Sequence, residues 1–194
     1  RQGVETLVKA ISNPKLHSLG NLRLTLINNS PNINPLKQKR IEQLVWELGL
    51  DNITTFVPGL SREELATYHA AADVCVVPSH YNPSGMVAMD AMASGTPVIA
   101  SNLGGLKYVV EHKKSGILFP AQNSFLLTKA LAHLISEPQL RSQLGISARV
   151  RIEELFTWDV VARQLSEFYR EQIEQQNLES LHQALRYSVR AVGA

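Results

Sequence analysis

Between residues 22 and 119 the chain alternates short apolar runs with longer amphipathic segments. The apolar and β-branched runs predict strands at residues 22–27, 53–57, 74–77, 97–100 and 117–119. Apolar side chains at helical spacing predict helices at residues 35–48, 61–72 and 84–94, with a further helix from residue 106. The run at residues 74–77 is apolar throughout, which is typical of a parallel strand that is covered on both faces. This alternation predicts an α/β fold built on a doubly wound parallel sheet.

Beyond residue 124 the pattern becomes purely helical, with helices expected at 139–155 and 158–177. We expect Trp158 to anchor the last of these helices in the core. At the other end, residues 4–11 form an amphipathic helical pattern with no strand before it. From this we expect a fragment of a longer protein, with a domain at residues 1–177 that lacks its first strand and a helical tail at residues 178–194.

Composition narrows the classes of function. Hydrophobic residues make up 44% of the 194, and 19 basic side chains face 17 acidic ones, for a net charge of +2. So small an excess predicts no nucleic-acid partner. No apolar run approaches ~18 residues, so we expect no membrane span. The chain opens without a signal peptide, and we expect a cytoplasmic protein.

Single residue types add two further expectations. Cys75 is the only cysteine and lies in an apolar run, which favours a buried thiol over a reactive one. The six histidines do not show the spacing of metal ligands, so the sequence predicts no metal site.

Candidate chemistry is concentrated in residues 78–100, where a strand ends, a loop follows and a helix is expected from Ser84. The first amides of a helix have no intrahelical acceptor and, with the helix dipole, favour a phosphate. The amides in question are those of Gly85, Met86 and Val87. Asp90 follows Met86 by four residues, on the same helix face and ~6 Å further along the axis.

Residues 78–100 resemble the signature of the family-four retaining glycosyltransferases of the GT-B fold. That signature reads Glu-Pro-Phe-Gly, four residues, Glu-Ala-Met-Ala, a small residue and Gly-x-Pro-Val, and here Asn82 and Asp90 stand at the two acidic positions. The resemblance extends over about residues 1–172. Within the family, the sequences Pro-Ser-His-Tyr and Gly-Gly-Leu-Lys-Tyr-Val-Val on either side of the motif look most like sucrose-phosphate and sucrose synthases, particularly cyanobacterial ones.

The resemblance implies a Rossmann-like domain, the C-terminal half of a GT-B fold, that binds UDP-glucose or another nucleoside diphosphate sugar and needs no separate cofactor. An amino-terminal domain, absent from this chain, would supply the acceptor-sugar side and any general base. The implied roles are hexose contact for Asn82, ribose contact for Asp90 and diphosphate contact for Gln2. The amides of residues 85–87 would hold phosphate oxygens, and the base would lie near residues 57–60.

Several departures from the family pattern keep a second function open. Asn82 replaces Glu and brings no negative charge, Asp90 is one methylene shorter than Glu, and Gln2 replaces a diphosphate-binding Lys. These changes favour a degenerate binding or regulatory domain as the alternative to a transferase. A nucleotide-binding domain of unrelated function is disfavoured by the length of the motif match.

A purely structural role is the alternative interpretation for several of these residues. The run of residues 82–85 is a plausible helix start, with Asn at the N-cap and Pro in the first turn. Asp90 alone would be a solvated helix residue, and His80 a polar loop residue. The pair Gly104 and Gly105 is either a tight turn or a donor-side loop.

Overall fold

The computed structural model describes residues 3–28 and 35–192, with side chains described through residue 179. The chain divides into two units, Arg1–Ile152 and Glu153–Ala194. The strands are β1 (Leu24–Ile27), β2 (Thr54–Val57), β3 (Cys75–Val77), β4 (Val98–Ser101) and β5 (Gly116–Phe119). The helices are α1 (Val4–Ile11), α2 (Pro14–His17), α3 (Pro35–Glu47), α4 (Arg62–Ala71), α5 (Met86–Ala93), α6 (Leu106–Val109), α7 (Ser124–Ser136), α8 (Pro138–Leu155) and α9 (Trp158–Val192), with a 3-10 turn η1 (Asp51–Ile53).

All five predicted strands form, and every pairing between them is parallel. The expectation of one sheet is wrong in the described part of the chain, because the strands form a two-stranded sheet, β1-β2, and a three-stranded sheet, β3-β4-β5. Registers are regular, with Leu24 opposite Thr54 and Val98 opposite Gly116. Since all neighbouring strands run in one direction, the carboxyl ends of β3, β4 and β5 lie at one edge of their sheet.

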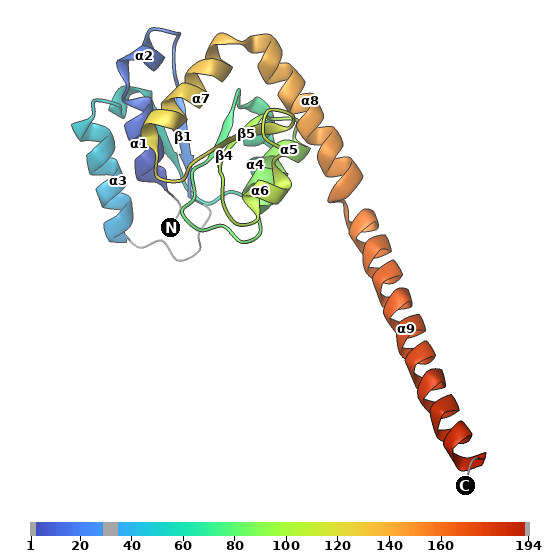
Figure 1. The fold of residues 1–194 in the computed structure, drawn as a ribbon. Coiled ribbons are helices and arrows are strands. Elements are labelled where there is room, and N and C mark those ends of the chain that lie inside the picture. The colour runs from blue at the N-terminus through green and yellow to red at the C-terminus, as the bar shows by residue number, and fades with distance from the viewer. Residues whose placement is uncertain (1–2, 29–34, 193–194) are drawn as a thin grey trace. The chain divides into compact units, whose positions relative to one another are not determined.

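The helices of the first unit form two groups, as a doubly wound fold requires (Figure 1). Helix α1 packs against both α3 and α7, and α7 also contacts β4 and β5. Helices α4 and α6 both contact α5, which packs against β3 and β4. The α/β fold predicted from the alternation is therefore confirmed.

One apolar core joins the first group of helices to the strands. Its fully buried side chains include Val8 of α1, Ile99 of β4 and Leu127 of α7, none of which has exposed surface. Strand β2 contributes less, since Thr55 and Phe56 are exposed. Burial of apolar area at about 25 cal/mol per Å² makes this core the main stabilising element of the first unit.

Helix α8 approaches the loop after α5 through two glycines. Gly145 is buried in α8, and a Cβ placed on it would overlap the carbonyl oxygen of Gly95. Gly95 itself has φ 77, a left-handed conformation that favours glycine. Glycine at residue 145 therefore permits a helix-to-loop contact that a side chain would block.

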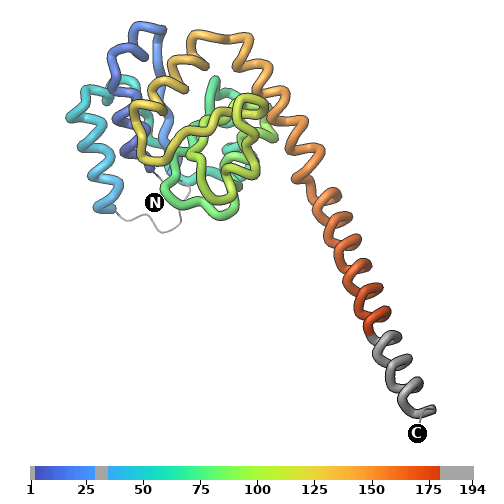
Figure 2. Tube along the Cα trace, viewed as in Figure 1, coloured from blue at the N-terminus to red at the C-terminus, as the bar shows by residue number. Residues whose placement is uncertain are grey.

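The second unit consists of the end of α8 and the long helix α9, whose trace is followed in Figure 2. The predicted carboxyl-terminal helix is confirmed. The prediction that Trp158 is buried is wrong, because its side chain is 86% exposed at the first turn of α9. It belongs to an exposed apolar stripe on this helix with Val161, Leu165, Phe168 and Ile173. Among the described helices, none combines the length and the apolar character needed to cross a membrane.

The glycine contact yields a prediction about stability. Gly145→Ala gains about 1 kcal/mol of helix propensity but must displace the Gly95 backbone, a change that costs about 1–3 kcal/mol. We expect a net loss in urea-induced unfolding, whereas Ser147→Ala on the exposed side of α8 stays within about 0.5 kcal/mol of the parent. A Gly145→Ala variant as stable as the parent would show that α8 and the loop do not pack closely.

Candidate functional site

The candidate site is built from the loops that follow β3 and β4. The first loop runs from Pro78 to Gly85 and leads into α5, and the second runs from Asn102 to Gly105 and leads into α6. Both start at the carboxyl edge of the same sheet, where open α/β sheets bind their ligands. The position predicted for the site is therefore the one that the fold favours for binding.

The two loops touch backbone to backbone. The amide of Gly105 donates to the carbonyl of Asn82 over 2.9 Å. A Cβ on Gly104 would overlap that carbonyl, and a Cβ on Gly105 would overlap the carbonyl of Pro83. Gly104 also has φ 49, in the left-handed region. The sequence left two interpretations of this glycine pair, a tight turn or a donor-side loop. In the structure the pair holds the first loop, residues 78–85 (the motif loop), in place by close approach.

Helix α5 begins two residues later than predicted, at Met86, with Gly85 as its N-cap. Gly85 has φ 70, which disfavours a side chain, and a Cβ there would lie 2.9 Å from Cγ2 of Val109 on α6. Met86 and Val87 are about half exposed at the start of the helix. The helix start therefore opens to solvent while Gly85 packs against α6.

Asn82 is not the N-cap residue of α5, but its side chain caps the turn that leads to the helix. Its Oδ1 accepts a hydrogen bond from the Gly85 amide over 2.7 Å, and its Nδ2 donates to Ser79 Oγ over 3.4 Å. Of the three amides proposed for phosphate, the one on Gly85 is therefore already used. Those of Met86 and Val87 lie in the first turn, where no intrahelical acceptor exists.

Asp90 lies half-buried on the second turn of α5, beside α4 and β3. Burial lowers the pKa of His69 on α4, and the negative charge of Asp90 opposes that shift. Burial raises the pKa of Cys75 on β3 to about 12, and Asp90 adds to that rise. Cys75 is half-buried rather than part of the core, and with this raised pKa its thiol is protonated at neutral pH.

His69 is a polar residue near the site that the sequence did not single out. It is 6% exposed, and its Nε2 has no hydrogen-bond partner in the described part of the chain. Its carbonyl accepts from Thr96 Oγ1 over 2.5 Å. A lone histidine near the end of an amphipathic helix carries no motif, so only the packing of α4 on α5 reveals it.

Arg151, on α8, supports the end of α6, the short helix that follows the second loop. Its guanidinium donates to the carbonyls of Tyr108 and Val109, each over 2.9 Å, and to Glu111 Oε2 over 3.2 Å. Because Val109 contacts Gly85, this arginine braces the helix that supports the motif loop. No pattern in the sequence links residue 151 to residues 108–111, so the role of Arg151 was not predicted.

The remaining predicted residues are located as follows. Gln2 lies outside the described residues. His80 is exposed, with its Nε2 3.5 Å from Thr6 Oγ1 of α1. The proposed base-binding loop, residues 57–60, follows β2 and precedes α4, whose Ser61 and Glu64 form the expected capping box. No group of three or more potential metal ligands occurs among the residues that the structure describes.

Known proteins resemble this chain in sequence and fold. A family model described as glycosyl transferases group 1 matches residues 1–151. A D-inositol 3-phosphate glycosyltransferase from Saccharomonospora viridis is 36% identical over 149 residues, which cover 76% of this chain and 34% of that protein. The chain thus spans about a third of the length of that relative.

Solved structures agree with the family match. A sucrose-phosphate synthase from Thermosynechococcus elongatus has a TM-score of 0.78 at 39% identity, with 90% of this chain and 43% of that one covered. Anabaena HepE, solved with UDP and glucose, shares the fold at 23% identity and a TM-score of 0.78, with 88% and 45% covered.

The capping role of Asn82 can be tested by stability. Asn82→Ala removes the acceptor of the Gly85 amide and should cost about 0.5–2 kcal/mol in urea-induced unfolding. Asn82→Asp keeps the acceptor and adds a negative charge near a helix start, so it should be at least as stable as the parent. Equal stability of the Ala variant and the parent would contradict the capping role.

The effect of the Asp90 charge on the pKa of His69 gives a second test. Because the folded-state pKa of His69 is lowered, its contribution to stability is present above the unfolded value of about 6.5 and is lost as the pH falls. Asp90→Asn removes the opposing charge, so NMR titration should show a still lower His69 pKa. Asp51→Asn, at an exposed position, should leave it unchanged. An unchanged His69 pKa in Asp90→Asn would mean that the carboxylate points elsewhere.

Proposed function

Because this chain belongs to the glycosyl transferases group 1 family, we propose that it is the donor-binding half of a retaining glycosyltransferase that uses a nucleoside diphosphate sugar. The observation that carries the proposal is the start of α5, where Met86 and Val87 are about half exposed and their amides have no intrahelical acceptor, one turn before Asp90. The amides suit a diphosphate, and the carboxylate suits the ribose hydroxyls. The two features lie in the order in which a nucleotide presents those groups.

In this proposal the helix start stabilises the leaving diphosphate as the bond to the sugar breaks. Backbone donors fixed before the reaction are effective there, because they need no reorganisation as negative charge develops. The contact between the Gly104–Gly105 loop and the motif loop keeps those donors in position. Residues 57–60 would complete the site on the side of the base.

Asn82 contributes a neutral amide at the hexose side. Since its Oδ1 already accepts from Gly85, its Nδ2 is the atom left for a sugar hydroxyl, in competition with Ser79. A carboxylate at this position would instead place a negative charge beside the positive charge that develops on the sugar. Hexose contact by Asn82 therefore supports binding more than catalysis.

Two named relatives suggest the class of acceptor. One is a sucrose-phosphate synthase and the other a D-inositol 3-phosphate glycosyltransferase, and both names contain a phosphorylated small polyol or sugar. We propose UDP-glucose as the donor and a sugar or sugar phosphate such as fructose 6-phosphate as the acceptor. The acceptor side would come from a second domain, and we expect a cytoplasmic enzyme.

The second candidate is a domain that binds nucleotide without transferring sugar. It is favoured by Asn82, whose carboxamide serves as a structural cap where the family pattern has an acid. Both candidates share nucleotide recognition, and only turnover separates them.

Calorimetry on this chain tests the nucleotide site. Each lost charge-assisted contact is worth about 1.5–3 kcal/mol, so the two replacements, Asn82 and Gln2, should weaken UDP-glucose by roughly two to four powers of ten, to beyond the micromolar range. Asp90→Ala should weaken it further, whereas Asp51→Ala should not. Asn82→Asp should improve UDP-glucose but not UDP, because that position faces the hexose.

We expect no transfer to fructose or fructose 6-phosphate by this chain alone. Turnover, or micromolar affinity for UDP-glucose, would show that Asn82 and Gln2 substitute well for the charged residues. Unchanged UDP binding in Asp90→Ala would contradict the ribose role.

A further inference from the structure

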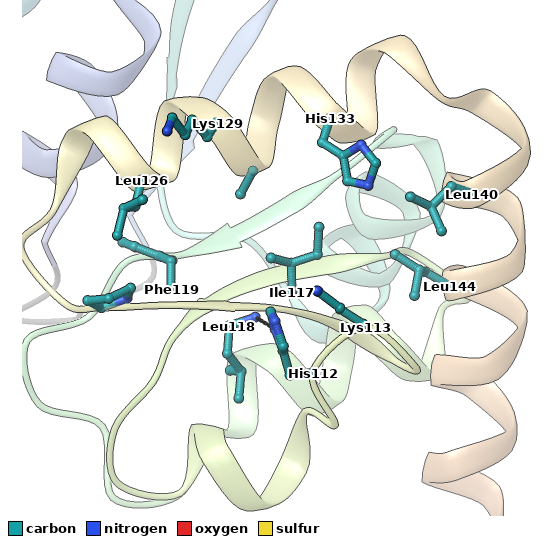
Figure 3. Close-up of a pocket in the computed structure, with 12 residues that line it drawn as sticks. His112, Lys113, Ile117, Leu118, Phe119, Leu126, Lys129, His133, Leu140 and Leu144 are labelled. Carbon is teal, nitrogen blue, oxygen red and sulfur yellow. Dashed lines mark hydrogen bonds between the residues drawn. The ribbon is translucent and has the colours of Figure 1, made fainter.

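A groove of about 670 Å³ lies beside the outer strand β5, away from the loops of the candidate site. Its volume is within the range of about 300–1,000 Å³ that is common for small-molecule pockets. Figure 3 shows it between β5, α7 and the first turns of α8. The floor is apolar, with Ile117 and Phe119 from β5, Leu126 from α7, and Leu140 and Leu144 from α8. The groove belongs entirely to the first unit.

The ionisable side chains that line this groove are all basic. They are Lys113, Lys129, His112 and His133, and no acidic residue is among the lining residues. The nearest acid along the chain, Glu111, is engaged by Lys114 at 2.5 Å and by Arg151 at 3.2 Å. Among the described residues, no ion pair neutralises Lys113. The groove thus combines an apolar floor with uncompensated positive charge at its edge.

Lys113 is held in an unfavourable backbone conformation. Its φ of 66 lies in the left-handed region, where a side chain costs roughly 1–2 kcal/mol and glycine is preferred. The turn that imposes this conformation is closed by bonds from Lys113 N to Gly116 O over 2.7 Å and from Ser115 N to Glu111 O over 2.9 Å. A lysine at a position that suits glycine points to a use for its side chain.

The outer edge of β5 is partly closed to a peptide strand. The amide of Leu118 donates to His112 Nδ1 over 2.9 Å, as the dashed line in Figure 3 shows. An added strand would need such amides for its own hydrogen bonds. Occupation by a side-on β-strand is therefore disfavoured relative to a ligand that lies on the apolar floor.

We propose that this groove binds an anionic amphiphile with a single acyl chain. The chain lies along the floor between β5, α7 and α8, and the carboxylate or phosphate head pairs with Lys113 at the edge. A fatty acid and a single-chain lipid phosphate share this chemistry. The site is independent of the nucleotide site, so either can fail without the other.

The test is calorimetry with C12 probes below their micellar concentrations. Dodecanoate and dodecyl phosphate should bind at least roughly tenfold tighter than the uncharged dodecyl maltoside, because only they pair with Lys113. Acetate and inorganic phosphate should not bind measurably, since they lack the chain. Whichever C12 anion binds tighter identifies the head group, carboxylate or phosphate.

Lys113→Gly separates a functional side chain from a structural one. It should weaken the C12 anions by roughly tenfold or more, yet raise Tm by about 2–4 °C through relief of the left-handed strain. The control Lys107→Ala removes the same charge from an exposed position outside the groove and should leave C12 affinity unchanged. Equal affinity for charged and uncharged probes, or unchanged affinity in Lys113→Gly, would overturn the proposal.

Discussion

The candidate site depends on one contact, the backbone-to-backbone approach of the loops that follow β3 and β4. Asn82 and Pro83 present carbonyls to Gly104 and Gly105 at distances that exclude a Cβ. That contact sets where α5 begins, because Gly85 is fixed between the Asn82 side chain and Val109 of α6. Arg151 on α8 bonds the carbonyls of Tyr108 and Val109 at the end of α6. The start of α5 is therefore held by the loop that contains Asn82 and by α6, which α8 supports. A ligand at that helix start would meet donors that are already in position.

The hydrogen bond from the Gly85 amide to the Asn82 side chain explains what the substitution at residue 82 changes. An amide oxygen satisfies the Gly85 N–H as well as a carboxylate does, so the loop keeps its shape without an acid. What is lost is the negative charge that the family pattern has at this position. The shape of the loop at residues 78–85 is thus separable from the charge at residue 82, and a family member can keep the first while it changes the second.

Most of the helices and strands could be predicted from local sequence patterns. Strands such as β3 are short apolar runs between turn residues, and the capping box at Ser61 marks the start of α4, so neither needs tertiary information. The helix α2 was missed because a four-residue helix, here one that begins at the Pro of an Asn-Pro pair, is too short to show periodicity. The division into two sheets was also missed, since strand order depends on pairing between distant segments.

The site was predictable only in part, for a similar reason. Residues 82–90 are contiguous and carry a family motif, whereas His69 and Arg151 reach the site through packing of α4 and α8. Nothing local distinguishes a glycine pair that forms a turn from one that admits another backbone. Trp158 shows the opposite error, because an aromatic side chain at a helix start was assigned to the core and is exposed.

The division of the strands into two sheets affects the tendency of the chain to aggregate. Within the described residues, the two sheets present four edges, and unpaired edges invite pairing between molecules. The strands that form them are only three or four residues long, and His112 occupies one amide on the outer edge of β5. Short strands leave few free backbone groups in a row, and this limits the length of edge that another chain can pair with. Lengthening any of these edges with apolar residues would raise the tendency to aggregate.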